Sequence, residues 1–564
     1  MRALTALFLV SLPAIAATKE IAPGANLAME FSLLNAGDEL ILSGGTYTLG
    51  TSQLPLGGSG TAAMPIVIRG KTGERAHITR PNRNQNIMDI SGRYLVLRDL
   101  EFSGGSAGLR FLSAASFVTL EGCNVHDTAD VAIRANDTGG TYDGFRILRN
   151  EVHHTGDTGE AMYLGCNSNG CQFANSLIEG NWVHHTNGAS VIQGDGIELK
   201  EGSYNNVIRD NVIHDTKYPC ITLYSAGTQT NTPNIVSRNV LWRCGDHGIQ
   251  VSQDATIQNN IILSAVNDGI SVQTHMQVAG GTGNVRIVNN TVIDANGGAI
   301  AVRGATAPIL VANNAVYTST GAALFVNASG SFVTFTNNVG VGSGPMLTPG
   351  VLANDFVAAN FSGTVPNDVF PKAGSALIGA GSGPVAPADD FNGTPRGTPT
   401  TVGAYQMAPM NPGWTIVAGF KGATGSGGGA AGGGAAGGGS ASAGGSASAG
   451  GSASAGGSAS AGGSASAGGS ASAGGSASAG GSASAGGSAS AGGSASAGGS
   501  ASAGGSASAG GTASAGGAAS AGGSASAGGG TEVPPPMGCG CSVTSTMWPL
   551  LAVAAWTLRR RRNR

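Results

Sequence analysis

The stretch Ile147-Leu148-Arg149-Asn150-Glu151-Val152 decides the fold, because its pattern returns along most of the chain. The pattern is an apolar residue, two variable residues, Asn, one variable residue and a second apolar residue. Neighbouring copies lie 21 to 31 residues apart, a spacing typical of a repeat protein. The clear copies centre on Asn150, Asn181, Asn211, Asn239, Asn260, Asn290 and Asn314, and weaker ones carry Asp99, Cys123 and Asn338 at the same place.

A second motif, Gly-Ile-x-Val or a variant, lies between several copies, as in Gly196-Ile197-Glu198-Leu199. A unit of about 27 residues with short alternating strands is typical of one coil of a parallel β-helix, here about ten coils. Alternation places Ile197 and Leu199 inward and Glu198 and Lys200 outward. We expect the repeated Asn at an inward bend, where stacked amides hydrogen-bond from coil to coil. A β-propeller is the rival fold, but its blades need about 40 residues.

The composition fits such a solenoid. Of 564 residues, 97 are Gly, only 10% are charged and 5% are aromatic. Tight bends need Gly and Asn, and a narrow core needs β-branched residues. The same values argue against a coiled coil or a helical bundle. Five arginines lie in the last six residues, so the rest of the chain is more acidic than the net charge of -3 suggests. An acidic chain is not expected to bind nucleic acid.

The first 16 residues read as a signal peptide. Arg2 supplies the positive start, Ala3–Ile15 is mostly apolar, and Ala14-Ile15-Ala16 has the form of a cleavage site. We therefore expect export across the inner membrane, followed by a β-helix domain over residues 18–407.

Residues 408–536 form a low-complexity segment. From Ser440 to Gly529 the unit Ser-Ala-Ser-Ala-Gly-Gly recurs fifteen times, with departures only at Thr512 and Ala518. Small residues bury little apolar surface, so we expect a disordered linker that holds the domain away from a membrane. A silk-like sheet is the alternative, although the Gly-Gly pairs would interrupt it.

Residues 537–564 hold a three-part tail. It contains Gly538-Cys539-Gly540-Cys541, an apolar stretch from Met547 to Leu558, and the cluster Arg559–Arg562 with Arg564. The tail resembles the myxobacterial sorting signals known as Myxo-CTERM. The resemblance implies a short hydrophobic transmembrane helix, processing near Cys539 or Cys541 by sorting machinery, and retention at the cell envelope or surface. A plain membrane anchor is the alternative.

A second resemblance covers roughly residues 20–407. The start, Ala36-Gly37-Asp38-Glu39-Leu40-Ile41-Leu42-Ser43-Gly44-Gly45-Thr46-Tyr47, is similar to the opening of the pectate-lyase-like superfamily, with Ala36 for Pro. The close, Asp390–Arg396 with Val402-Gly403-Ala404-Tyr405, is similar to the terminal segment common in such bacterial proteins. The resemblance implies a right-handed parallel β-helix. It specifies function weakly, because one fold hosts many activities.

The cysteines agree with export. Cys166 and Cys171 lie close together in a Gly/Asn/Ser loop and are expected to form a local disulfide. Cys123 is expected to be a buried thiol, and Cys220 and Cys244 either buried thiols or a second bridge.

Aligning the coils gathers polar side chains on the outer face of the Gly-Ile strand. Residues at one place in successive coils should form a single patch, because coils stack about 4.8 Å apart. The loop between Cys166 and Cys171 and the insertion Gly202–Asn206 are expected to wall the patch. The patch should contain Glu160, Tyr163, Asp195, Glu198, Lys200, Tyr224 and His247, with Arg134 one coil earlier.

This patch suits cleavage of a uronate polysaccharide by β-elimination. The reaction needs a base, an acid for the leaving oxygen, and a cation to neutralise the sugar acid. Carboxylates are ligands that Ca²⁺ prefers. A surface ion pair between Glu198 and Lys200 is the structural alternative. The candidates are Lys200 or Tyr163 as base, Asp195, Glu160 and Glu198 as calcium ligands, and Arg134 or His247 in support.

Asp195-Gly196-Ile197-Glu198-Leu199-Lys200 with Asn205-Asn206 is similar to an Asp-Gly-Phe-x-x-Lys…Asn stretch of polysaccharide lyase family nine. The resemblance implies that Asp195 is a calcium ligand. The family's next coil carries Asp-Asp-Gly-Trp-Asp, where this chain has Tyr218-Pro219-Cys220-Ile221-Thr222. Only Asp195 therefore carries over.

A second column is more regular, with His126, His153, His184 and His214 at coil spacing, followed in each coil by Asp127, His154, His185 or Asp215. It is either a structural ladder of packed rings or a metal site.

The sequence therefore predicts an exported β-helix protein that acts on an extracellular, acidic polysaccharide by a lyase-like reaction. A non-catalytic carbohydrate-binding or adhesive surface protein is the second hypothesis. A glycoside hydrolase is a third, because Glu160, Asp195 and Glu198 supply acids at one level.

Overall fold

The structure is a computed structural model. It describes residues 16–225, 232–274, 282–328 and 331–422, and the backbone of fifteen short strands between residues 441 and 528. The chain divides into two compact units, Met1–Ala431 and Gly432–Arg564. The predicted signal peptide (residues 1–16), apart from Ala16, and the predicted tail (residues 537–564), with Cys539 and Cys541, lie outside the described residues. Within the described part, no helix is long and apolar enough to cross a membrane.

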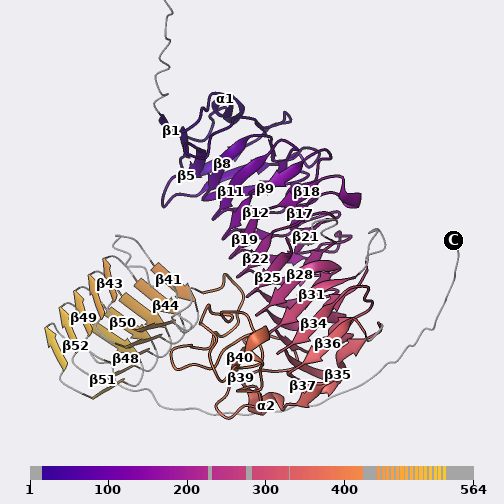
Figure 1. Ribbon diagram of the computed structural model, residues 1–564. Helices are drawn as coiled ribbons and strands as arrows, with labels where there is room; N and C mark the ends of the chain where they lie inside the picture. Colours follow the sequence, from indigo (N-terminus) through magenta and orange to yellow (C-terminus); the bar gives the residue numbers. More distant parts are fainter. Residues whose placement is uncertain are drawn as a thin grey trace, which may run out of the picture. The chain divides into compact units, whose positions relative to one another are not determined.

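The first unit is a right-handed parallel β-helix, as predicted (Figure 1). Each coil contributes one strand to a 13-stranded parallel sheet, here called sheet A. Its strands, in spatial order, are β1 (Thr18–Ile21), β2 (Glu39–Leu42), β5 (Ile66–Gly70), β8 (Arg93–Arg98), β11 (Ser116–Glu121), β15 (Arg146–Leu148), β19 (Leu177–Glu179), β22 (Val207–Arg209), β25 (Asn234–Ser237), β28 (Gln253–Gln258), β31 (Gly283–Val288), β34 (Ile309–Ala312) and β36 (Val333–Thr336).

A 23-stranded sheet forms the rest of the coil in two stacked rows. Row B holds β3 (Gly45–Thr48), β6 (Ala76–Arg80), β9 (Leu100–Gly104), β12 (Asn124–His126), β16 (Glu151–His153), β20 (Trp182–Thr186), β23 (Val212–Thr216), β26 (Val240–Cys244), β29 (Ile261–Ala265), β32 (Thr291–Ile293), β37 (Asn338–Ser343) and β38 (Leu347–Pro349). Row C holds β4 (Pro55–Leu56), β7 (Met88–Ile90), β10 (Leu109–Phe111), β13 (Ile133–Ala135), β17 (Met162–Leu164), β21 (Ile197–Leu199), β24 (Ile221–Leu223), β27 (Ile249–Val251), β30 (Asp268–Val272) and β33 (Gly298–Val302). The long β35 (Ala315–Val326) belongs to both rows.

Few elements lie outside this pattern. Helix α1 (Leu27–Ser32) covers the first coils with its buried Leu27 and Phe31. The remaining short elements are β14 (Thr141–Asp143), β18 (Gln172–Ala174), α2 (Leu352–Asp355), β39 (Phe356–Ala358), β40 (Asp368–Pro371) and two single 3-10 turns, Asn167–Asn169 and Gly383–Val385.

The repeated asparagines form the predicted internal ladder. Each side-chain amide donates to the side-chain oxygen of the Asn one coil on, at 2.9–3.0 Å from Asn150 to Asn338. The same oxygen also accepts the backbone N–H of the preceding Asn, for example at 2.9 Å between Asn181 and Asn211. All of these side chains are buried, so their full hydrogen bonding offsets the cost of removing amides from water.

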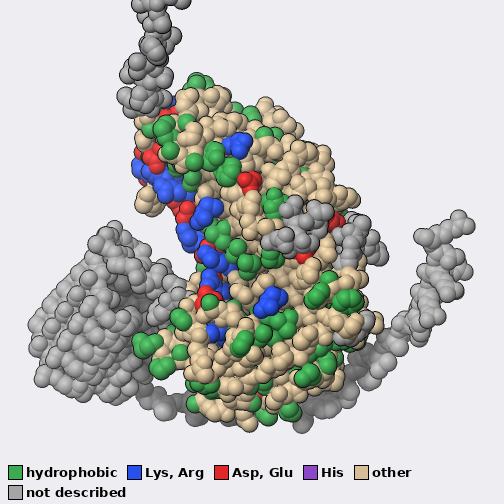
Figure 2. Space-filling view, viewed as in Figure 1, with side chains coloured by type: hydrophobic (Ala, Val, Ile, Leu, Met, Phe, Trp, Pro, Cys, Tyr) green, Lys and Arg blue, Asp and Glu red, His purple; other side chains and the backbone are tan. Residues whose placement is uncertain are grey.

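Charged side chains gather along the outer face of sheet A (Figure 2). They are paired across neighbouring coils, as in Arg69 with Glu39 at 2.7 Å and Arg209 with Glu179 at 3.0 Å. This face is therefore a chain of surface ion pairs, each worth little by itself.

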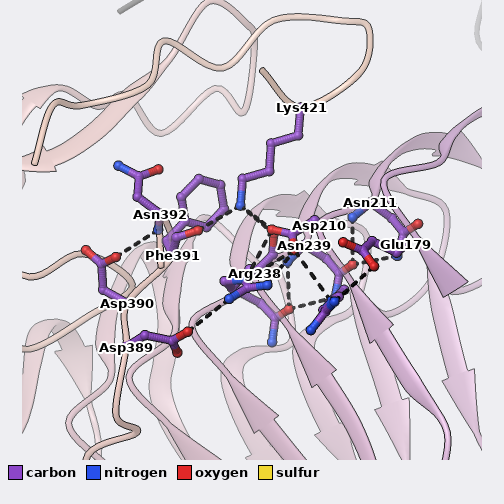
Figure 3. Close-up of polar contacts among 12 residues, drawn as sticks. Glu179, Asp210, Asn211, Arg238, Asn239, Asp389, Asp390, Phe391, Asn392 and Lys421 are labelled. Carbon is purple, nitrogen blue, oxygen red and sulfur yellow. Dashed lines mark hydrogen bonds and ion pairs between the residues drawn. The ribbon is translucent and has the colours of Figure 1, made fainter. Parts of the chain in front are cut away.

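The packed chain continues beyond residue 407, where we predicted the linker to begin. Ile416 is fully buried in the core cluster that Phe391 and Tyr405 also join. The Lys421 ammonium donates to Asp210 Oδ1 at 2.7 Å and to the Phe391 carbonyl at 2.7 Å (Figure 3). The predicted boundary is thus too early, because the apolar residues of 408–421, such as Trp414, Ile416 and Phe420, follow neither a strand nor a helix period.

We expect a chain ending at residue 407 to unfold at a lower temperature than a chain ending at residue 422. The shorter chain leaves the Asp210 carboxylate without its buried cation and exposes the surface that Ile416 covers. Thermal unfolding followed by circular dichroism compares the two chains. Equal unfolding temperatures would show that residues 408–421 add nothing to stability.

The repeat also differs from the expected disorder. Residues Ala441–Gly444 (β41) through Ala525–Gly528 (β55) form fifteen strands in three five-stranded sheets. Every third repeat pairs in parallel, as Ala441–Gly444 does with Ala459–Gly462. Identical repeats can pair backbone to backbone in one register, so strand formation here does not need the apolar burial on which our expectation rested.

Candidate functional site

The outer face of row C carries the predicted column of polar residues. Arg134 pairs in register with Tyr163, Tyr163 with Glu198, and Glu198 with Thr222. The inward neighbours Ile197 and Leu199 are buried in the core, which fixes the side on which Glu198 lies. The alignment of coils made from the sequence is therefore confirmed.

These side chains line an open pocket of about 580 Å³. Its lining includes seven residues of the sequence-predicted set, namely Arg134, Glu160, Tyr163, Asp195, Glu198, Lys200 and Tyr224.

Two parts of the prediction are not met. His247 does not line the pocket: its ring is buried, Nδ1 accepts the backbone N–H of Asp268 at 3.1 Å, and Nε2 lies 3.3 Å from the Gln273 amide. The insertion Gly202–Asn206 does not wall the pocket either, because Asn206 turns inward and donates to Asn234 at 3.0 Å. The loop closed by the Cys166–Cys171 disulfide does contribute, through Asn167.

Several acids of the pocket were missed from the sequence. Asp130, Asp157 and Asp246 each lie in the turn before a row C strand. Asp130 and Asp246 both lie three residues before their strand, but the coils between them carry Gly159, Gly194 and Tyr218 at that place, so the acids form no continuous column. With them, the pocket carries six carboxyl groups against the two cations Arg134 and Lys200.

Lys200 lies between two aromatic rings. Its Nζ is 4.6 Å from the centre of the Tyr163 ring and 4.5 Å from that of Tyr224. It donates to Glu198 Oε1 at 2.6 Å and to the Tyr224 hydroxyl at 3.4 Å. The side chains of Lys200 and Glu198 are 6% and 3% exposed, so this is a buried ion pair and not the surface pair considered from the sequence.

This environment holds the proton on Lys200. Burial lowers the pKa of its ammonium, but the combined effects of Glu198, Tyr224 and Tyr163 exceed that of burial and raise the pKa above its ordinary value. Burial also raises the pKa of the Tyr163 and Tyr224 hydroxyls. In this arrangement Lys200 is a proton donor and a fixed positive charge, and neither tyrosine is ionised near neutral pH.

Three carboxyl groups face this cation. Asp195 and Glu160 occupy matching places in neighbouring coils, where the Ala161 N–H donates to the Asp195 carbonyl at 2.9 Å. Asp195 Oδ1 accepts the Thr222 hydroxyl at 2.6 Å. Neither carboxyl oxygen of Glu160 accepts a hydrogen bond from a described residue, since the nearby Thr158 hydroxyl donates to Asp130 at 2.9 Å.

Burial changes the protonation of these acids. It raises the pKa of Glu198 to about 7, against the opposing effect of Lys200. Burial, together with the charge of Glu198, raises the pKa of Asp195 well above its ordinary value, and burial also raises that of Glu160. The charge of Glu198 adds to the effect of burial on Asp195, so the titrations of these two carboxyl groups are coupled.

Arg134 is held at the edge of the pocket. Its Nε donates to Asn136 at 2.7 Å and its Nη1 lies 3.3 Å from Asp130. The group is one-third exposed and remains close enough to the pocket to meet a ligand.

Clusters of three potential metal ligands occur elsewhere in the described residues. They are His77 with Glu101 and His126, and Glu151 with His153 and His184. Glu160, Asp195 and Glu198 do not form such a cluster, although the unpartnered Glu160 carboxyl could accept a cation together with Asp195. Calcium binding in the pocket stays a prediction.

The histidine column forms a stack on row B. The ring centres of His126, His153, His184 and His214 lie 4.9, 4.7 and 5.4 Å apart in sequence, and Trp242 continues the stack 4.2 Å beyond His214. Burial, with the neighbouring rings, lowers the pKa of His153 to about 4 and that of His184 to about 3. The rings of His153 and His184 are thus neutral near pH 7, and the column stacks as the ladder considered from the sequence.

Three further cysteines lie in the described residues. Cys220 and Cys244 form a second disulfide across 24 residues, and Cys123 is a buried thiol whose pKa burial raises to about 12.

Comparison with known proteins gives one family match. Residues 192–316 match the family described as a right handed beta helix region, a stretch that includes Asp195, Glu198 and Lys200. No curated protein sequence matches.

The chain is similar to solved structures that include two lyases and one protein in complex with xylose. An alginate lyase from Paenibacillus sp. FPU-7 is 18% identical over 50% of this chain and 95% of its own, with a TM-score of 0.39. The pectate lyase Pel9A is 16% identical over 70% of this chain and 97% of its own, with a TM-score of 0.42. XylC in complex with xylose is 10% identical over 69% of this chain and 98% of its own, with a TM-score of 0.46. The family match and the strand stacking together make residues 18–343 a right-handed parallel β-helix.

Proposed function

We propose that the protein cleaves an extracellular polysaccharide in the row C pocket. The observation that carries this proposal is the group of three buried carboxyls, Glu160, Asp195 and Glu198, that face one open pocket with raised pKa values. A buried acid destabilises a fold when its hydrogen bonds do not offset the cost of removing it from water. Acids with strongly shifted pKa values cluster at functional sites.

The carboxyl pair suits hydrolysis of a glycosidic bond. Cleavage needs one acid to protonate the leaving oxygen and one carboxylate to act as base or nucleophile. Burial raises the pKa of both Asp195 and Glu198, which suits a pair in which one carboxyl group donates its proton while the other is ionised. The Lys200 ammonium, 2.6 Å from Glu198, stabilises the ionised form after the proton leaves.

β-Elimination of a uronate is the second candidate, and the position of Lys200 between the Tyr163 and Tyr224 rings favours it. Lys200, which keeps its proton, would donate it to the leaving oxygen, and the Tyr163 or Tyr224 hydroxyl would take the substrate proton after ionising at a pH above neutral. The excess of acids in the pocket would repel a uronate, so this reaction needs an added cation. Glu160 and Asp195 would hold calcium, which neutralises the sugar carboxylate when bound.

One assay separates these functions. The chain over residues 16–422 is incubated with neutral glycans and with pectate, alginate and glycosaminoglycans, and both reducing ends and the ultraviolet absorbance of unsaturated sugars are followed. New reducing ends without absorbance indicate hydrolysis, and both signals together indicate elimination. Binding to a glycan without either signal would replace cleavage by the carbohydrate-binding function.

Calcium removal tests the second candidate directly. If the reaction is elimination, a chelator should lower activity on a uronate by at least about tenfold, and Ca²⁺ should restore it. The matched control is the Glu160→Gln variant, which keeps the side-chain shape and should lose the calcium response. Activity that is insensitive to the chelator would contradict a calcium-dependent elimination.

We also propose that the protein is exported and retained at the cell envelope. The leader and the three-part tail support this, as do the Cys166–Cys171 and Cys220–Cys244 disulfides, since disulfides form in oxidising compartments. Cell fractionation of the native chain and of a chain ending at residue 530 tests it. The truncated chain should appear in the medium, and its retention on cells would contradict a role for the tail.

A further inference from the structure

We propose that Glu151, His153 and His184 bind a divalent transition-metal ion of the Zn²⁺ class. The site lies on the outer face of row B and shares no residue with the row C pocket. Two imidazoles and one carboxylate form a ligand set that Zn²⁺ uses in proteins.

The stacking of coils brings the three ligands together. Glu151 and His153 lie two apart on β16, so both point to the same face, and His153 pairs in register with His184 on β20. Their ligand atoms all lie within 4.8 Å of one another. The Nε2 atoms of His184 and His153 lie 3.3 and 3.9 Å from Glu151 Oε1. Ligands of tetrahedral zinc are about 3.4 Å apart for bonds near 2.1 Å, so small side-chain rotations complete the site.

Neighbouring side chains orient each ligand. The Nδ1 atoms of His153 and His154 are 2.6 Å apart, and those of His184 and His185 are 2.7 Å apart. His153 and His184 can each carry a proton on Nδ1 and donate it to the Nδ1 of the next histidine, His154 or His185. The Nε2 lone pairs of His153 and His184 then both face Glu151. The Asn124 amide donates to Glu151 Oε2 at 3.0 Å, while Glu151 Oε1 faces the rings of His153 and His184. Such outer partners are the usual means of fixing a metal-binding histidine.

The charge around Glu151 distinguishes this site from the other cluster. In the cluster of His77, Glu101 and His126, the carboxylate of Glu101 already forms an ion pair with Arg75. Among the described residues, Glu151 has no ion pair with Lys or Arg. No Lys or Arg therefore competes with a bound cation for this carboxylate. Trp182 packs 4.2 Å from the His184 ring and covers one side of the site.

A metal here would link two successive coils. Glu151 and His153 belong to one coil and His184 to the next, so binding stabilises the folded solenoid and not the unfolded chain. We therefore expect Zn²⁺ to raise the unfolding temperature as well as to bind.

The test is Zn²⁺ titration of the full-length, metal-stripped protein without a polyhistidine tag, by calorimetry and by thermal unfolding. Co²⁺ serves as a spectroscopic probe, because its visible absorption reports the coordination geometry. His184→Ala and Glu151→Gln should each weaken Zn²⁺ binding by at least about tenfold and remove the Zn²⁺-dependent rise in unfolding temperature. Glu151→Gln preserves shape and packing, so it remains informative if His184→Ala folds poorly.

His214→Ala is the matched control. His214 belongs to the same stack but is paired with Asp215 at 2.6 Å and lies outside the ligand cluster. This variant should bind Zn²⁺ as the native protein does. Equal binding by Glu151→Gln and the native chain, or absence of tight binding by the native chain, would overturn the proposal and leave the histidines as a packing ladder only.

Discussion

Replacing Glu198 by Gln should lower kcat/KM on the polysaccharide substrate by about 10² to 10⁴-fold, the range typical for loss of a general acid or base. Gln retains the shape of Glu198 and can still accept a hydrogen bond from Lys200, but it carries no transferable proton. The protein should stay folded, because Glu198 lies on β21 between the buried residues Ile197 and Leu199. Initial-rate kinetics and a circular dichroism spectrum check both expectations.

The pH profile of the native enzyme gives an independent measure. The pKa of Glu198 is raised to about 7, so its protonated form is abundant below pH 7 and is lost above it. If Glu198 is the acid, activity should fall as the pH rises through about 7, and this limb should vanish in Glu198→Gln. The matched control is Glu179→Gln, since Glu179 forms an ion pair with Arg209 on the outer face of sheet A. An unchanged rate in Glu198→Gln would remove this residue from the mechanism.

Replacing Asn211 by Ala should lower the free energy of unfolding by about 3 to 5 kcal/mol, from ~1–3 kcal/mol for each buried polar group left without a partner. The Asn211 oxygen accepts both the backbone N–H and the side-chain amide of Asn181 at 2.9 Å. Its own amide donates to the Ile178 carbonyl at 3.0 Å and to Asn239 at 2.9 Å. The change therefore breaks the ladder at its centre and leaves several buried groups unsatisfied.

Denaturant unfolding of residues 16–422 measures this loss. Asn84→Ala is the matched control, because Asn84 is exposed and lies outside the ladder. We expect the control to change stability by no more than about 0.5 kcal/mol. If both variants lose equally little, the ladder contributes register alone and not stability.

The repeat of Asn and the Gly-Ile motif were sufficient to predict the coils and their register. The reason is local: alternation decides which side chains are buried, and a slip of one residue would expose the apolar set. Alternation predicts Tyr163, Glu198 and Lys200 on one outer face, and in the structure all three line one pocket.

Features that depend on loops were not predictable in this way. His247 precedes a strand just as Asp195 does, yet its ring turns toward the Asp268 backbone and away from the pocket. Asp130, Asp157 and Asp246 reach the pocket from turns, and the neighbouring coils carry no acid at the same places, so the sequence shows no column of acids there.

The sequence by itself determined a right-handed parallel β-helix and the row of polar residues on its outer face, because both follow from a period of two within strands and about 27 residues between coils. Only the tertiary structure decided how deeply those residues are buried, which partners they have and how their pKa values shift. Two tyrosine rings flank Lys200, its ion pair with Glu198 is buried, and burial raises the pKa of the neighbouring Asp195. Desolvation depends on everything packed around a group, and that sum exists only in the folded chain.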